Sequence, residues 1–195
     1  MLKFICTILL GLCLSFIDSY ATDNPKDIIT PSTKLVYDVY DNGNYYELIM
    51  SIKKSENNTT SIEWKMNEPA KEKGSIHLTK NDLENGNGFY KFFTEKIAVL
   101  NNQNCVLLST NMFDQLKNNS ETTLFIDNKK YTTANFGNLY YHTQNFGLGN
   151  NFNNEFNCAT VTNGYYQITF VNDRDFPLIM DLKLDYTIKL KKILP

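Results

Sequence analysis

The side chains that most often carry chemistry are few in this chain and widely separated. Its 195 residues hold two histidines, His77 and His142. Neither has a second His, Cys or carboxylate at the spacing of a helical or hairpin metal site. The sequence contains no G-x-S-x-G nucleophile elbow, no phosphate-binding P-loop and no H-E-x-x-H helix. We therefore name no catalytic residue, no metal ligand and no cofactor. A non-enzymatic protein is favoured, with the question of an activity left open.

Four cysteines are present, and two of them fall in an N-terminal segment that is assigned below to a signal peptide. The other two, Cys105 and Cys158, would be exported together, and an even pair in an oxidising compartment indicates a disulfide. The alternative is two buried free thiols, because free cysteine also behaves as a small core hydrophobe. A nucleophilic pair of Cys105 and His142 is least favoured, since nothing in the sequence lowers the pKa of the thiol.

The most unusual tract runs from Asn135 to Asn157, where aromatic residues are interleaved with glycines and asparagines. Aromatic faces beside amide donors are a usual combination in a site for a sugar or another amphipathic ligand. The more ordinary interpretation is a long connection whose aromatic side chains turn back into the fold. The candidate ligand platform of this tract consists of Phe136, Tyr140, Tyr141, Phe146 and Phe152.

Charge is nearly balanced, with 19 Lys and Arg against 21 Asp and Glu and a formal net charge of −2. Nucleic-acid binding usually needs a basic stripe that displaces counterions from phosphates. The tightest basic group, Lys189, Lys191 and Lys192, lies in an alternating pattern that is typical of a solvated sheet face. We therefore expect no nucleic-acid partner. The expected partner is an apolar or carbohydrate ligand, or a protein of the cell envelope.

The start of the chain predicts export. Lys3 precedes an apolar run from Phe4 to Ile17, and Ser19 and Ala21 place small residues three and one before a cleavage point. This is the pattern of a secretory signal peptide, residues 1–21, cleaved after Ala21. The run is shorter than the roughly 18 to 20 residues that a membrane-spanning helix needs. We therefore expect a secreted or periplasmic protein with no transmembrane helix in the mature chain.

The remaining sequence, which must position any site, has the period of β structure. Residues 22–33 are polar and contain two prolines, so they predict a flexible leader, and residues 34–195 predict a single β-rich domain. Asn42-Gly43 and Asn163-Gly164 each separate two alternating runs and predict β-hairpins. About a dozen short strands at regular spacing predict a mainly β fold, a curled antiparallel sheet or a barrel-like domain.

Two stretches break the alternation and predict two short helices. One rests on the phenylalanines of residues 89–93, and the other on the apolar set of residues 112–116 after a candidate cap at Ser109 or Thr110. The single tryptophan, Trp64, lies in an alternating strand. We expect it inside the domain with its indole N–H hydrogen-bonded.

Two segments near the carboxyl end, residues 175–180 (DFPLIM) and 186–190 (YTIKL), carry a resemblance to a known group of proteins. They resemble the closing strands of uncharacterised secreted β-rich proteins of Bacteroidota. The resemblance implies a bacterial envelope or secreted protein and supplies no functional residue. We therefore expect an exported β domain that binds an apolar ligand or a protein partner. The alternatives are a small outer-membrane β-barrel and a hydrolase with a scattered carboxylate site.

Overall fold

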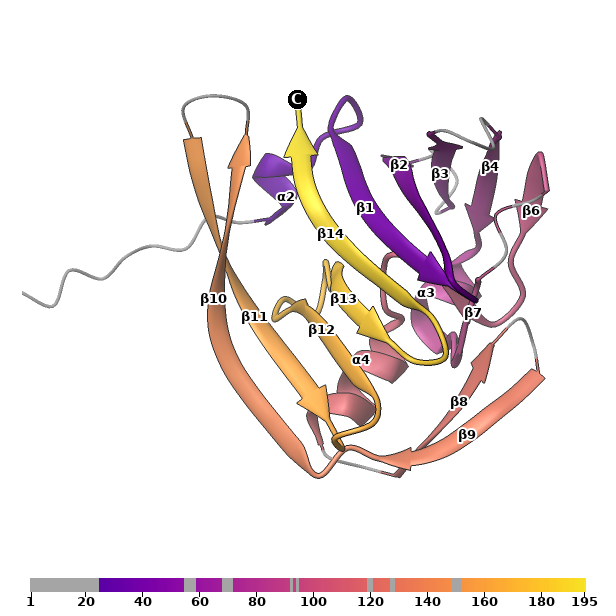
Figure 1. The fold of residues 1–195 in the computed structure, drawn as a ribbon, viewed down its shortest axis with the longest axis vertical. Helices are drawn as coiled ribbons and strands as arrows, with labels where there is room; N and C mark the ends of the chain where they lie inside the picture. Colours follow the sequence, from indigo (N-terminus) through magenta and orange to yellow (C-terminus); the bar gives the residue numbers. More distant parts are fainter. Residues whose placement is uncertain are drawn as a thin grey trace, which may run out of the picture.

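The computed structural model describes residues 25–54, 59–67, 72–91, 93, 95–118, 121–126, 129–148 and 152–195. The predicted signal peptide, residues 1–21, and the first residues of the predicted leader lie outside these ranges. Two β-sheets and short helices make up the fold (Figure 1). In the described part of the chain, no helix combines the length and the apolar character needed to cross a bilayer.

The larger sheet has ten strands in the order β10-β11-β12-β13-β14-β1-β2-β3-β4-β6. Their bounds are β1 (Lys34–Asp41), β2 (Asn44–Lys54), β3 (Thr60–Met66), β4 (Lys73–Leu78), β6 (Ile97–Val99), β10 (Asn138–Leu148), β11 (Phe152–Thr162), β12 (Gln167–Val171), β13 (Ile179–Lys183) and β14 (Thr187–Leu194). Neighbours along this order are antiparallel except β4 and β6. The sheet curls until Leu148 of β10 bridges Ile193 of β14, without closing into a barrel. The predicted mainly β class is confirmed.

Both predicted hairpins form, each through its Asn-Gly pair. Between β1 and β2, Asn42 and Gly43 have φ of 49° and 81°, and these positive values at both central residues are what a type I′ turn requires. Between β11 and β12, Gly164 has φ of 89°. There the Asn163 side chain accepts hydrogen bonds from the backbone N–H groups of Tyr165 and Tyr166, at 3.1 and 2.9 Å.

The smaller sheet has the order β7-β5-β8-β9. It consists of β5 (Gly88–Phe89), β7 (Gln103–Asn104), β8 (Glu121–Ile126) and β9 (Lys129–Asn135). The helix predicted from residues 89–93 is wrong, because Phe89 lies in β5 and pairs in parallel with both β7 and β8. Pairing on both sides satisfies the backbone as a strand, and this tertiary context overrides the spacing of the phenylalanines.

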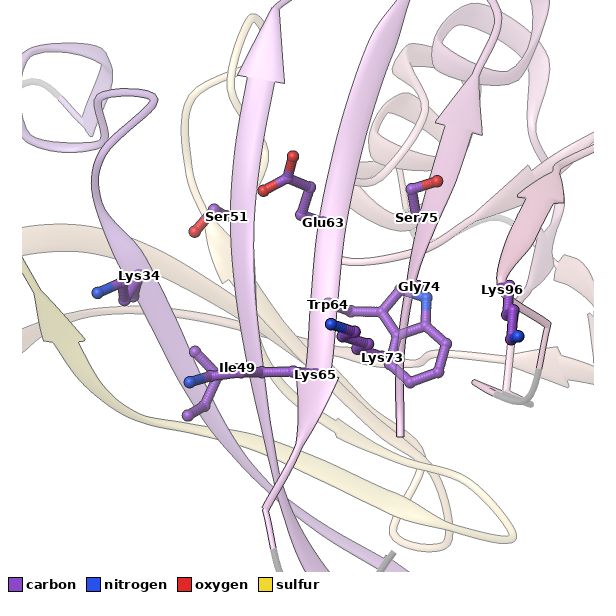
Figure 2. A pocket seen from close by; sticks show the side chains of 10 residues that line it. All are labelled: Lys34, Ile49, Ser51, Glu63, Trp64, Lys65, Lys73, Gly74, Ser75 and Lys96. Atoms are coloured by element: carbon purple, nitrogen blue, oxygen red, sulfur yellow. The ribbon is translucent and has the colours of Figure 1, made fainter. Parts of the chain in front are cut away.

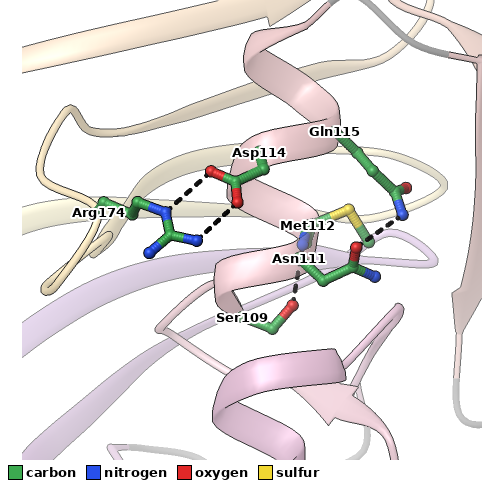
Figure 3. Close-up of polar contacts among 6 residues, drawn as sticks. All are labelled: Ser109, Asn111, Met112, Asp114, Gln115 and Arg174. Carbon is green, nitrogen blue, oxygen red and sulfur yellow. Dashed lines mark hydrogen bonds and ion pairs between the residues drawn. The ribbon is translucent and has the colours of Figure 1, made fainter.

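The two short helices begin at side-chain caps. Helix α3 (Lys80–Asn85) starts with a capping box, in which Thr79 accepts from the Asp82 N–H and the Asp82 carboxylate accepts from the Thr79 N–H. Helix α4 (Thr110–Lys117) starts at Ser109, whose hydroxyl accepts from the Met112 N–H at 3.0 Å (Figure 3). The predicted helix at residues 112–116 is therefore confirmed, and its apolar side faces the core.

Figure 3 also shows how α4 is tied to the segment before β13. The guanidinium of Arg174, the only arginine of the chain, donates to both carboxylate oxygens of Asp114, at 3.0 and 2.8 Å. This bidentate pair is exposed to solvent, so it fixes the orientation of the segment more than it stabilises the fold.

The described part of the predicted leader packs onto the domain. Helical turn α2 (Pro25–Ile28) precedes β1 in the chain. Ile29 follows it, is 8% exposed and belongs to the hydrophobic core. The hydroxyl of Thr33 donates to the Ile28 carbonyl at 3.1 Å, which closes the turn before β1. Ordered packing thus begins before Lys34, the residue from which the domain was predicted.

A single hydrophobic core joins the two sheets and α4. Phe113 of α4 packs edge-on against Phe170 of β12, with 5.4 Å between the ring centroids. Tyr37 of β1 is fully buried, and its hydroxyl donates to the Ile179 carbonyl at 3.0 Å. Burial raises the pKa of Tyr37 well above its ordinary value, so the phenol stays protonated and keeps donating this bond.

Candidate functional site

Strand alternation gives β3 and its neighbours two different faces. Ile62 and Trp64 of β3 point into the core and are 0% and 3% exposed, whereas Glu63 and Lys65 are exposed on the other side. Directly opposed residues of neighbouring strands share a face, so Ser75 of β4, opposite Glu63, lies on that other side as well. We call this side of β1, β2, β3, β4 and β6 the open face.

The open face carries a groove of about 680 Å³ (Figure 2). Four lysines from four different segments surround it, and its remaining lining is contributed mainly by β2, β3 and β4. We call it the lysine groove. Its lining residues are Lys34, Ile49, Ser51, Glu63, Trp64, Lys65, Lys73, Gly74, Ser75 and Lys96.

The lysine groove is rich in positive charge. Within the described ranges, its four lysines have no ion-pair partner. Its single carboxylate, Glu63, is bound by Lys53 at 2.5 Å. Elsewhere on the same face Lys191 is neutralised by Glu47 and Asp38, at 2.6 and 3.3 Å. The contrast shows that acidic partners are present on this face and are placed away from the groove lysines.

Two of these lysines stand directly opposite each other. Lys65 of β3 pairs with Lys73 of β4 in the antiparallel register. Like charges at directly opposed positions of a sheet destabilise the pairing. A local choice that opposes stability is expected at functional sites. The Lys65–Lys73 pair therefore places two like charges side by side at the groove.

Behind the groove, on the core side of the sheet, Trp64 and Gly74 are closely packed. A Cβ atom at Gly74 would lie 2.8 Å from Cζ2 of the Trp64 ring and 2.6 Å from the Glu95 carbonyl oxygen, so only glycine fits there. The Trp64 ring packs edge-on against Phe93, with 5.7 Å between centroids. The predicted burial of Trp64 is confirmed. Its indole N–H, however, has no hydrogen-bond partner among the residues that the structure describes, contrary to expectation.

The structure does not bring the predicted aromatic platform together. Phe136 is fully buried, and Phe146 packs against the buried Phe156 with 6.0 Å between centroids. Tyr140 and Tyr141 are exposed but consecutive in β10, so their side chains lie on opposite faces. The side chain of Phe152 lies outside the described part of the chain. The tract forms the long β10–β11 hairpin, paired without interruption from Asn138 to Leu148.

Cys105 and Cys158 are both buried, and both are free thiols in the structure. The structure therefore gives no support to the predicted disulfide. Burial raises the pKa of each thiol to about 12, which suppresses the reactive thiolate at neutral pH. His142, proposed as a partner of Cys105 in the least favoured interpretation, is exposed on β10 and stands opposite Cys158 instead.

We expect neither Cys105 nor Cys158 to react with a thiol reagent at pH 8 while the chain is folded. A pKa of about 12 leaves about one thiol in ten thousand ionised at that pH, and the protein covers both sulfur atoms. Both are expected to react in denaturant without a reductant. Alkylation followed by peptide mass mapping reports each position separately. Two peptides that stay unlabelled in denaturant until reductant is added would demonstrate the disulfide and contradict the free thiols.

In the described part of the chain, no three His, Cys, Asp or Glu side chains come together as metal ligands would. His77 of β4 lies beside Ser75, with 3.5 Å between Nε2 and the hydroxyl oxygen. His142 lies beside Gln144, with 3.2 Å between their nitrogen atoms. Each histidine therefore has a local polar neighbour on its own strand.

Sequence reasoning missed the lysine groove. Lys34 was named only as the start of the predicted domain, and Lys65, Lys73 and Lys96 were not singled out. The alternation of Ile62, Glu63, Trp64 and Lys65 was a usable signal for the outward direction of Lys65. Convergence of the four lysines depends on strand pairing, which a single sequence does not give.

The chain matches no protein-family model, no curated protein and no solved structure. The lysine groove is therefore interpreted from its own residues.

Proposed function

We propose that the chain is an exported, non-enzymatic β domain that binds a multiply charged anionic ligand in the lysine groove. The observation that carries the proposal is the set of four groove lysines that have no ion-pair partner among the described residues, in a chain whose formal net charge is −2. The predicted signal peptide supports the exported location.

The arrangement of the groove favours a ligand with several charges. A single exposed ion pair contributes little, about 0.2–1 kcal/mol, so one anionic group gives only weak binding. The lysines lie on β1, β3, β4 and just before β6, and an extended ligand with a charge every few ångströms contacts several of them at once. The hydroxyls of Ser51 and Ser75, which also line the groove, add hydrogen-bonding groups for a polar ligand.

The same residues support binding over hydrolysis. Glycoside hydrolysis uses two carboxyl groups on either side of the scissile bond. The lining of the lysine groove contains one carboxylate, Glu63, which is exposed and already ion-paired with Lys53. Neither desolvation nor a second acid is present in this lining to make Glu63 a general acid.

Binding of a soluble sulfated oligosaccharide, compared with its unsulfated counterpart, tests the proposal. Isothermal titration calorimetry is expected to detect the sulfated form at about 50 mM salt and to show affinity lower by about tenfold at 300 mM, because exposed charges are screened. The unsulfated form is expected to give no heat. Equal binding of both forms, or no binding of the sulfated form at low salt, would contradict the proposal.

A further inference from the structure

The edge strand next to the lysine groove carries exposed aliphatic side chains. Ile97 and Val99 of β6 are 67% and 69% exposed, whereas Ala98 between them is buried. In the parallel pairing of β6 with β4, Ile97 is the partner of Ser75 and Val99 the partner of His77. Since Ser75 lines the groove, the two aliphatic side chains lie on the open face and extend the groove surface with an apolar border.

This pair is unusual for an edge strand of a soluble protein. Edge strands normally carry lysine, proline or a bulge, because exposed β-branched residues promote aggregation. Lys96 directly precedes Ile97 in the chain. Lys73 is the first residue of β4, the strand that pairs with β6. The result is a small aliphatic patch beside ammonium groups that have no ion-pair partner in the described part of the chain. Aliphatic side chains beside flexible lysines are a combination suited to the boundary between lipid headgroups and acyl chains.

We infer that Ile97 and Val99, together with Lys65, Lys73 and Lys96, dock the domain on an anionic lipid bilayer. The aliphatic side chains enter the interfacial layer, and the lysines contact the phosphate groups of the lipids. This inference rests on the proposed function, because the closely spaced phosphate groups of the bilayer then supply the several negative charges that the groove binds. Strand β6 has only three residues, so an added peptide strand would gain few main-chain hydrogen bonds there. A bilayer would contact the side chains of Ile97, Val99 and the lysines and needs no main-chain hydrogen bonds.

Vesicle co-sedimentation tests the inference. The processed chain that begins at Thr22 contains every described residue and is the form used. We expect it to sediment with vesicles of phosphatidylcholine mixed with phosphatidylglycerol. With vesicles of pure phosphatidylcholine, we expect it to stay in the supernatant. Ile97→Asn/Val99→Asn is expected to lower the partition onto the anionic vesicles by about tenfold or more. The control Tyr140→Asn/Tyr165→Asn removes two aromatic side chains that are also exposed but lie elsewhere, and it is expected to leave partition unchanged.

Binding of the sulfated oligosaccharide distinguishes the anion site in the lysine groove from docking on a bilayer. Ile97→Asn/Val99→Asn is expected to bind it within about twofold of the unchanged chain, which also shows that the variant is folded. Binding of the oligosaccharide without binding of anionic vesicles would overturn the bilayer inference and leave the anion site intact. If the unchanged chain binds neither the oligosaccharide nor the anionic vesicles, the proposed function is overturned as well. A change from dimer to monomer in the variant, without any vesicle binding, would assign the patch to a second copy and overturn the inference.

Discussion

Replacing Asn104 by alanine is expected to lower the free energy of unfolding by about 3–5 kcal/mol, because three hydrogen bonds to buried backbone groups are lost at once. Asn104 of β7 is 1% exposed. Its side-chain amide donates to the carbonyl oxygens of Gly86 and Gly88, at 3.2 and 2.8 Å, and its side-chain oxygen accepts from the Ser109 N–H. Alanine removes every one of these bonds and leaves a buried cavity in place of the amide.

The exposed Asn101 provides the matched control, since Asn101→Ala deletes the same amide three residues away and is expected to change stability by less than about 0.5 kcal/mol. Urea unfolding followed by the fluorescence of the single tryptophan measures both variants. A cost below about 1 kcal/mol for Asn104→Ala would show that the backbone groups find other partners.

The Asn104 network matters for the site because it holds the segment that carries β6. Ser109 donates its hydroxyl hydrogen to the Gly86 carbonyl, and the buried Asp82 accepts from the Asn102 N–H at 2.6 Å. Leu100 donates to the His77 carbonyl of β4 at 3.1 Å. Residues 100–109 are thus fixed to α3, β4 and β5, and β6 with the preceding Lys96 is positioned by the same contacts.

Local turn and cap chemistry could be predicted from the sequence. Asn42-Gly43 and Asn163-Gly164 determine their hairpins through backbone conformations that most residues avoid, and Ser109 caps α4 as its residue type predicts. The capping box that begins α3 at Thr79 was visible in the sequence and was not used. These features depend on residues within a few positions of each other.

Features that depend on distant pairing could not be predicted. The glycines and asparagines after Asn135 indicate a loop by composition, yet the register with β11 makes most of them a strand. The spacing of the phenylalanines in residues 89–93 indicates a helix, yet Phe89 pairs with strands β7 and β8. The lysine groove is the same case, since Lys65 and Lys73 become neighbours only through the β3–β4 pairing. Composition and period say nothing about which exposed positions converge.

The measurement that tests the central claim most directly compares two double charge reversals for binding of the sulfated oligosaccharide. Lys65→Glu/Lys73→Glu replaces two attractions in the lysine groove by two repulsions and keeps a like-charged cross-strand pair. Lys129→Glu/Lys130→Glu makes the same change of net charge on the exposed β9. We expect the groove variant to lose affinity by about 100-fold and the β9 variant by less than about threefold. Equal losses in the two variants would show that net charge alone attracts the anion and would contradict a site in the groove.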